Sequence, residues 1–236
     1  MKVRRASDDA EADIGFDSNG DLDTAAIATH CGSANGYVVT WYDQSGNSNN
    51  ATQSTAGSQP QIYNGTAVIT DNGKPALDFD GSNDFLDVAY RLNLQNVGAV
   101  SVQNFANVSG SQLSITLSEG TNLQLYMHYN SGTNQWRLYY AGQGDNFVTA
   151  STGQQLQSFF TKSSDSSADY YTNGTSIGSL TQAGSVTSSN DLRIGAYTGN
   201  SLYTDMTFQE FVLWPSDQSS NRSGIETDIN DYFSIY

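Results

Sequence analysis

Alternating acidic residues make DSNGDLD, residues 17–23, the first stretch of the chain that could bind a metal ion. Oxygen-bearing side chains recur there at every second position, as they do where a calcium loop begins. The stretch departs from an EF-hand loop, because Gly20 is its fourth residue and Ala28 stands at the twelfth position, where Glu is required. We expect a solvated turn. The alternative is a calcium site whose ligands are Asp17, Asn19, Asp21 and Asp23.

A second acidic cluster follows a short alternating segment, PALDFDG. Leu77 and Phe79 share one face of a strand there, opposite two of the carboxylates. The pattern predicts a strand, a turn and another strand, and a metal site is again the alternative. The cluster comprises Asp78, Asp80, Asp84 and Asp87.

The cysteine and histidine content gives little support for a catalytic nucleophile or for a zinc site. Cys31 is the only cysteine, so an internal disulfide and a cysteine-based zinc site are excluded. The histidines are His30 and His128, and neither has an evident Ser or Cys partner in the sequence. We expect Cys31 to be a small buried thiol.

Aromatic and amide side chains instead indicate a surface that binds sugars, because sugar rings stack on aromatic faces and amides fix their orientation. Alternation puts Tyr126 and His128 on one face of the strand 122–130, and puts Trp136 opposite Tyr139 in the next one. Core packing is the competing explanation for most of these rings. The candidate carbohydrate-binding residues are Tyr126, His128, Trp136, Tyr139, Tyr197, Asp43 and Gln44.

Charge and hydropathy narrow the range of partners. The net charge is −15 with nine scattered Lys and Arg, which argues against nucleic acid and anionic membranes. No apolar run is long enough to span a bilayer, and the N-terminus lacks the apolar core of a signal peptide. We expect a protein of the extracellular space or of a cell or virion surface, which requires no cofactor. Its expected partners are a cell-surface glycan and neighbouring subunits, including further copies of itself.

Most of the chain predicts short strands separated by polar turns, which indicates an all-β sandwich or barrel. Helices are expected in 23–31 and in 223–233, the latter with a capping box formed by Ser223 and Glu226. The strand 36–42 is apolar at successive positions, so we expect it to be buried on both faces. Asp43 and Ser45 then suit an Asx-type turn, with Gly46 at positive φ.

Two C-terminal segments, DYYTNGTSIGSL (169–180) and LRIGAYTGNSLYTDMTFQEFVLWP (192–215), resemble concanavalin A-like and laminin G-like jelly rolls. The resemblance implies one β-sandwich domain over residues 1–236, built from two antiparallel sheets with one or two short helices.

The N-terminal part is similar to the opening of the catalytic domain of family-54 α-L-arabinofuranosidases. The similarity rests on VRRASD (3–8), Cys31, and YDQSG (42–46) with Asn49, Thr52 and Gln53. Segments like these also occur in proteins of marine bacteria and their phages.

The same resemblance implies where catalytic carboxylates would stand. A retaining glycosidase needs two carboxyl groups about 5 Å apart. The family's acid/base Asp follows an IGGD strand, and this chain has IGAY there, which puts Tyr197 at the Asp position. Its nucleophile falls six residues after a Trp, which from Trp136 is Gly142. The carboxylates weighed as replacements, each expected to face solvent, are Asp145, Asp205 and Glu210.

Without those carboxylates, the sequence favours a non-catalytic carbohydrate-recognition and adhesion module. It would belong to a phage tail, a virion surface or a bacterial adhesin that binds cell-surface polysaccharide. One alternative is an arabinofuranosidase-like glycoside hydrolase, active or relict. The other is a purely structural domain of a larger assembly.

Overall fold

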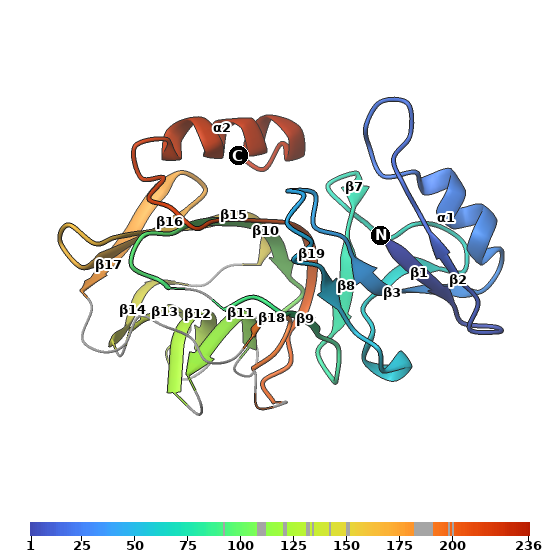
Figure 1. The fold of residues 1–236 in the computed structure, drawn as a ribbon, viewed down its shortest axis with the longest axis horizontal. Coiled ribbons are helices and arrows are strands. Elements are labelled where there is room, and N and C mark those ends of the chain that lie inside the picture. Colours follow the sequence, from blue (N-terminus) through green and yellow to red (C-terminus); the bar gives the residue numbers. More distant parts are fainter. Residues whose placement is uncertain are drawn as a thin grey trace.

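The computed structural model describes residues 1–91, 93–107, 112–119, 122–130, 133, 135–141, 143–149, 152–181, 191–197, 199 and 201–236. For residues 117–119, 122–130 and 145–148 it describes the backbone alone. The described strands form two antiparallel sheets that face each other, with helices on the outside (Figure 1). The predicted all-β, concanavalin A-like sandwich with short helices is therefore confirmed.

The first sheet has the order β9-β18-β11-β12-β13-β14. Its strands are β9 (Leu86–Val88), β18 (Leu192–Ile194), β11 (Gln112–Glu119), β12 (Asn122–Asn130), β13 (Gln135–Tyr140) and β14 (Gln143–Thr149). The second sheet has the order β8-β19-β10-β15-β16-β17. Its strands are β8 (Leu77–Asp80), β19 (Asp205–Trp214), β10 (Gly98–Phe105), β15 (Gly153–Lys162), β16 (Ser167–Thr172) and β17 (Thr175–Thr181).

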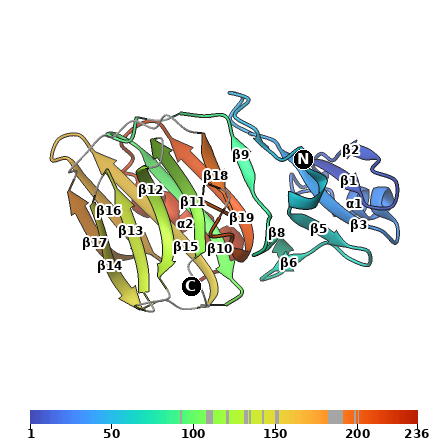
Figure 2. The ribbon, with the colours of Figure 1, turned by 90° about the horizontal axis from the view of Figure 1, so that it is seen from below.

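The N-terminal strands are hydrogen-bonded to both sheets (Figure 2). These elements are β1 (Lys2–Arg5), β2 (Glu11–Asp13), β3 (Asn35–Trp41), β4 (Ala51–Thr52), β5 (Gln61–Asn64), β6 (Thr70–Asp71), β7 (Lys74–Pro75) and the short 3-10 helix η1 (Ala56–Ser58). Strand β3 pairs with β5 and, at its end, with β4. β5 continues to β8 of the second sheet, and β4 continues to β9 of the first. This double connection holds the loop after β3 beside the edge of the sandwich.

Helix α1 (Thr24–Cys31) covers the N-terminal strands. Its N-cap is Asp23, whose Oδ1 accepts the backbone N–H of Ala26 at 2.9 Å, as capping chemistry favours. The helix buries Ile27 and Cys31, so the expected buried thiol is confirmed. Neither helix in the described part of the chain has the length and apolar character needed to cross a bilayer.

Helix α2 (Arg222–Phe233) lies over the outer face of the second sheet (Figure 1). The helix was predicted, but its capping box is wrong: the N-cap is Asn221, which makes no side-chain cap bond. Glu226 instead points into the protein and is 2 % exposed. Its carboxylate accepts the Ser158 hydroxyl at 2.5 Å and pairs with Arg222, so it fastens the helix to β15.

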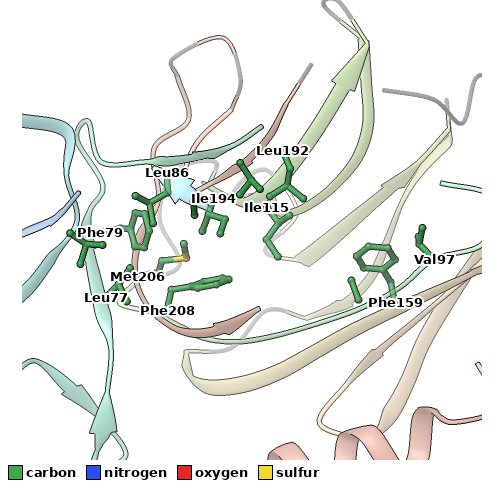
Figure 3. Packing of buried hydrophobic residues seen from close by; sticks show 14 of the residues in the cluster. Leu77, Phe79, Leu86, Val97, Ile115, Phe159, Leu192, Ile194, Met206 and Phe208 are labelled. Carbon is green, nitrogen blue, oxygen red and sulfur yellow. The ribbon is translucent and has the colours of Figure 1, made fainter. Parts of the chain in front are cut away.

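The core between the sheets is continuous with the N-terminal strands. Leu77, Phe79, Met206 and Phe208 from β8 and β19 pack toward Leu86, Ile115, Leu192 and Ile194 of the opposite sheet (Figure 3). Phe208 meets Trp41 of β3 in an edge-to-face contact, with ring centroids 6.1 Å apart. β3 itself is only half-buried outside Gly36 and Val38, so the expectation that both its faces are buried is wrong.

Candidate functional site

A groove of about 810 Å³ lies where the N-terminal strands meet the sandwich. We call it the junction groove. Its walls come from the hairpin 16–22, the loop 42–49, β7, the second half of β19 and the end of α2. Its floor is apolar, with Trp41, Leu192 and Phe211 among the lining residues, and its carboxylates are Asp21, Asp43 and Glu210. Apolar side chains together with polar groups that can fix a ligand's orientation are the usual lining of a small-ligand site.

Glu210 reaches this groove because β19 contains a β-bulge. Val102 of β10 pairs with Glu210 and the next residue, Gln103, pairs with Phe208, so Gln209 is the extra residue. The bulge lets both Phe208 and Phe211 pack against the core, although they are three positions apart. A bulge re-aims the side chain beside it, and here that side chain is Glu210.

The Glu210 carboxyl is held in an environment that favours its protonated form. Burial raises its pKa, because removal from water penalises the ionised state. Within the described part of the chain, no hydrogen bond or ion pair to this carboxylate is found. A protonated, unengaged carboxyl in a groove is the form that a general acid requires.

Tyr232 lines the same groove as Glu210 and is hydrogen-bonded to a second carboxylate. Its hydroxyl donates to Asp21 Oδ1 at 2.5 Å, and the Lys74 ammonium lies 3.7 Å from the centre of its ring. Burial raises the pKa of Tyr232 to about 12, with further contributions from the hydrogen bond to Asp21 and from the charges of Asp21 and Glu210. Both carboxylates therefore act on one hydroxyl across the groove.

Asp43 and Gln44 lie on the rim, but their polar atoms organise the loop. Asp43 accepts the Ser45 N–H at 2.7 Å, the Ser45 hydroxyl at 2.8 Å and the Asn49 N–H at 2.9 Å, which confirms the predicted Asx-type turn. These bonds lower the pKa of Asp43, with the Ser45 hydroxyl the largest cause. Gln44 donates to the Tyr42 carbonyl at 2.8 Å. Gly46 has φ +84°, as expected for the turn.

The candidate calcium residues are used in other ways. Asp17 Oδ1 accepts the backbone N–H groups of Asn19 and Asp21 at 2.8 and 3.1 Å, Asp21 accepts from Tyr232, and Asp23 caps α1. Among the residues that the structure describes, no group of three or more His, Cys, Asp or Glu is arranged to hold a metal ion. The segment is an acidic hairpin that the hydrogen bonds of Asp17 stabilise.

The second acidic cluster is likewise divided among structural contacts. Asp87 forms a two-pronged pair with Arg193, at 2.7 and 2.9 Å. Asp84 is 7 % exposed and accepts the Asp80 N–H at 3.2 Å. Burial, followed by the charge of Asp80, raises the pKa of Asp84 from 3.8 to about 7.

We expect Asp84→Asn to stabilise the protein at neutral pH. Below pH 4 the Asp84 carboxyl is protonated in both the folded and the unfolded chain. Between pH 4 and pH 7 it ionises only in the unfolded chain, so the free energy of unfolding of the wild type falls as the pH rises through this range. Asp84→Asn has no carboxyl to ionise, so its free energy of unfolding at pH 8 should exceed that of the wild type by about 1–3 kcal/mol. Urea denaturation at pH 4 and pH 8, with the exposed Asp228→Asn as control, measures the gain. The same difference in free energy of unfolding between Asp84→Asn and wild type at pH 4 and at pH 8 would contradict this prediction.

The remaining sugar-binding candidates are not brought together at the groove. Trp136 is 2 % exposed, with its ring centroid 4.6 Å from that of Phe105, so it offers no face to a ligand. Tyr139 is half-buried in β13, and Tyr197 pairs with Ser201 in the turn after β18. Tyr126 and His128 lie in β12, where only the backbone is described. Gly142 lies outside the described residues.

The residues that sequence reasoning missed in the site are Glu210 as an inward-facing acid, Tyr232 and Phe16. A signal for Glu210 was present, because FQEFVLW is apolar on both sides of the Glu and so breaks strict alternation. The contact between Asp21 and Tyr232 joins residues 211 positions apart, and no local pattern encodes it.

Comparison with known proteins finds a similarity in sequence to arabinofuranosidases for the N-terminal part of the chain and a similarity in fold for most of it. Residues 1–85 match the family model "Alpha-L-arabinofuranosidase B, catalytic". The structure is similar to an arabinofuranosidase complexed with arabinofuranosyl-α-1,2-xylobiose, with TM-score 0.67 and 15 % identity over 95 % of this chain and 57 % of that one. It is also similar to a family-54 α-L-arabinofuranosidase soaked with 4-nitrophenyl α-L-arabinofuranoside, with TM-score 0.71 and 17 % identity over 95 % and 58 % of the two chains. No curated protein sequence matches the chain.

These findings correct the functional expectation. A non-catalytic adhesion module of a phage, virion or bacterial surface is the wrong interpretation, because residues 1–85 match an arabinofuranosidase catalytic family and the fold is similar to that of solved arabinofuranosidases. The chain spans less than three fifths of the length of these structures. Its N-terminal 85 residues are similar to an arabinofuranosidase catalytic domain, and its fold is that of the family-54 arabinofuranosidases.

Proposed function

We propose that the chain is a glycoside hydrolase of the arabinofuranosidase kind and that it cleaves the glycosidic bond in the junction groove. The observation that carries this proposal is Glu210, a carboxyl in the groove whose pKa burial raises and whose oxygens no described residue engages. The match of residues 1–85 to an arabinofuranosidase catalytic family supports the reaction class.

Glu210 acts as the general acid. Its proton passes to the oxygen of the leaving group as the bond from that oxygen to the anomeric carbon breaks. Water supplies the hydroxyl that bonds to the anomeric carbon, and the remaining proton of that water passes to a groove carboxylate, so that the net reaction consumes one water and restores the protonated Glu210. The reaction needs a second carboxyl group to assist the attack on the anomeric carbon. We assign this role to Asp21, which lines the same groove and accepts the Tyr232 hydroxyl.

The substrate is an α-L-arabinofuranoside, which is the type of compound present in the similar structures. Trp41, Tyr42 and Phe211 line the groove and offer apolar faces to a sugar ring. Asp43 and Gln44 line the rim of the same groove, and that position supports the proposal that they contact sugar hydroxyls. Tyr197, which has no carboxyl, takes no part in the chemistry.

We expect the protein to release arabinose from an arabinofuranosyl oligosaccharide, whose sugar leaving group needs a proton, with a rate limited at high pH by Glu210. Because the acid must be protonated, kcat/KM falls as pH rises through the pKa of Glu210, which lies above the usual carboxyl range. Initial rates across pH 3–9 measure this fall of kcat/KM, which is the high-pH limb of the pH profile. Glu11→Gln, an exposed Glu→Gln change, should leave it in place. Absence of turnover, or a rate that does not fall with rising pH, would contradict the proposal.

A further inference from the structure

We infer that Phe16 is a platform for a second sugar ring, so that the junction groove takes a neutral oligosaccharide and not an isolated arabinoside. This deepens the proposed function and rests on the same groove. It also assigns a role to the acidic hairpin 16–22, whose carboxylates belong to no group of three or more described His, Cys, Asp or Glu residues arranged to hold a metal ion.

Phe16 is the most exposed large apolar side chain in the described part of the chain, at 58 %. Tyr232, at 45 %, is also among the exposed ones, and both line the groove. An aromatic ring left in water forgoes the free energy of burial, so its exposure at a groove is consistent with a ligand that covers it.

The hairpin holds Phe16 in a fixed position. Phe16 pairs with Leu22 across the hairpin, and the Asp17 N–H donates to the Asp21 carbonyl at 2.8 Å. Below this pair, the Asp23 N–H donates to the Gly15 carbonyl at 3.1 Å. Gly20 at φ +86° closes the tip, where a side chain would strain the backbone. A ring presented by a hydrogen-bonded hairpin loses little conformational freedom on binding.

The hairpin is also tied to the proposed reaction centre. The Asp21 carboxylate at its tip accepts the Tyr232 hydroxyl at 2.5 Å, and Glu210 acts electrostatically on that same hydroxyl. The Phe16 ring therefore belongs to the wall that carries the second catalytic carboxylate. A groove of about 810 Å³ lies toward the upper end of the range of about 300–1,000 Å³ for small-ligand sites, which leaves room for more than one sugar ring.

The negative charges around the groove favour a neutral oligosaccharide over an acidic one. Asp17 and Asp21 flank the platform, and Asp43 lines the same groove together with the cationic Lys74. The whole chain carries a net charge of −15. Acidic polysaccharides would be repelled at short range. Uncharged sugar rings stack on Phe16 without this penalty.

The test is the binding of a neutral arabinoxylan oligosaccharide, with methyl α-L-arabinofuranoside as the one-ring comparison, measured by isothermal titration calorimetry. We expect Phe16→Ala to raise the Kd of the oligosaccharide about five- to tenfold and to leave the Kd of the methyl glycoside unchanged. Phe16→Trp should restore the affinity. Tyr236→Ala removes an aromatic ring that is 55 % exposed and is not among the groove residues, and it serves as the matched control.

Equal oligosaccharide affinity for wild type and Phe16→Ala would overturn the inference, and so would the absence of oligosaccharide binding in every variant. An acidic oligosaccharide that binds more tightly than the neutral one would also overturn it. Binding needs no turnover, so a protein that binds through Phe16 but cleaves nothing would remove the proposed hydrolysis and leave the platform standing. Unfolding curves of wild type and Phe16→Ala should coincide, because the ring is exposed.

Discussion

Glu210→Gln is expected to lower kcat for an arabinofuranosyl oligosaccharide by about 10²- to 10⁴-fold, the range typical for loss of a general acid. Gln has the size of Glu but has no acidic proton to give to the leaving oxygen. A sugar leaving group needs that proton, whereas 4-nitrophenolate departs readily without it. The loss should therefore be much smaller for the nitrophenyl glycoside than for the oligosaccharide.

The measurement is kcat for both substrates in wild type, Glu210→Gln and the control Glu11→Gln. Glu210→Gln should also abolish the high-pH limb, because that limb reports the titration of the Glu210 carboxyl. A Glu210→Gln variant with wild-type kcat on the oligosaccharide would exclude Glu210 as the acid. An equal loss on both substrates would show that the variant disturbs the groove and not the proton transfer.

Phe208→Ala is expected to lower the free energy of unfolding by about 3–5 kcal/mol, as Phe→Ala changes in cores do. Phe208 is fully buried and meets Phe79 of the sandwich and Trp41 of β3 edge to face, with centroids 6.4 and 6.1 Å away. The cavity would open between the sheets and the N-terminal strands, where collapse requires movement of both.

Urea denaturation followed by tryptophan fluorescence measures this change. Phe208→Leu should lose less than Phe208→Ala, since it fills more of the space, and the exposed Tyr236→Ala should stay within about 0.5 kcal/mol of wild type. A Phe208→Ala variant less than about 1 kcal/mol below wild type would show that this junction is not a shared core.

Alternation was sufficient to predict the strands whose two faces differ. Leu77 and Phe79 point into the core and Asp80 to solvent, as the pattern predicts. β19 could not be assigned in this way, because its bulge at Gln209 changes which residues share a face halfway along the strand. The capping box failed for another reason: Glu226 makes tertiary contacts with β15 that outweigh a local cap.

The site shows the same division between local and distant interactions. The turn at Asp43 and Ser45 was predictable, because its hydrogen bonds join residues close in sequence. The groove was not, because it brings together a hairpin near residue 20, the end of β19 and the last turn of α2. The aromatic candidates of β12 and β13 were chosen from alternation alone, which does not show which rings a second sheet covers. Trp136 is one of the covered rings.

The central claim is that hydrolysis takes place at the junction groove and not at the turn after β18. The most direct test is the rate of arabinose release from one arabinoxylan oligosaccharide by wild type, Glu210→Gln and Tyr197→Phe, measured side by side. We predict release by wild type and Tyr197→Phe at similar rates, and a loss of about 10²-fold or more in Glu210→Gln. Loss of release in Tyr197→Phe with retention in Glu210→Gln, or no release by wild type, would contradict the claim.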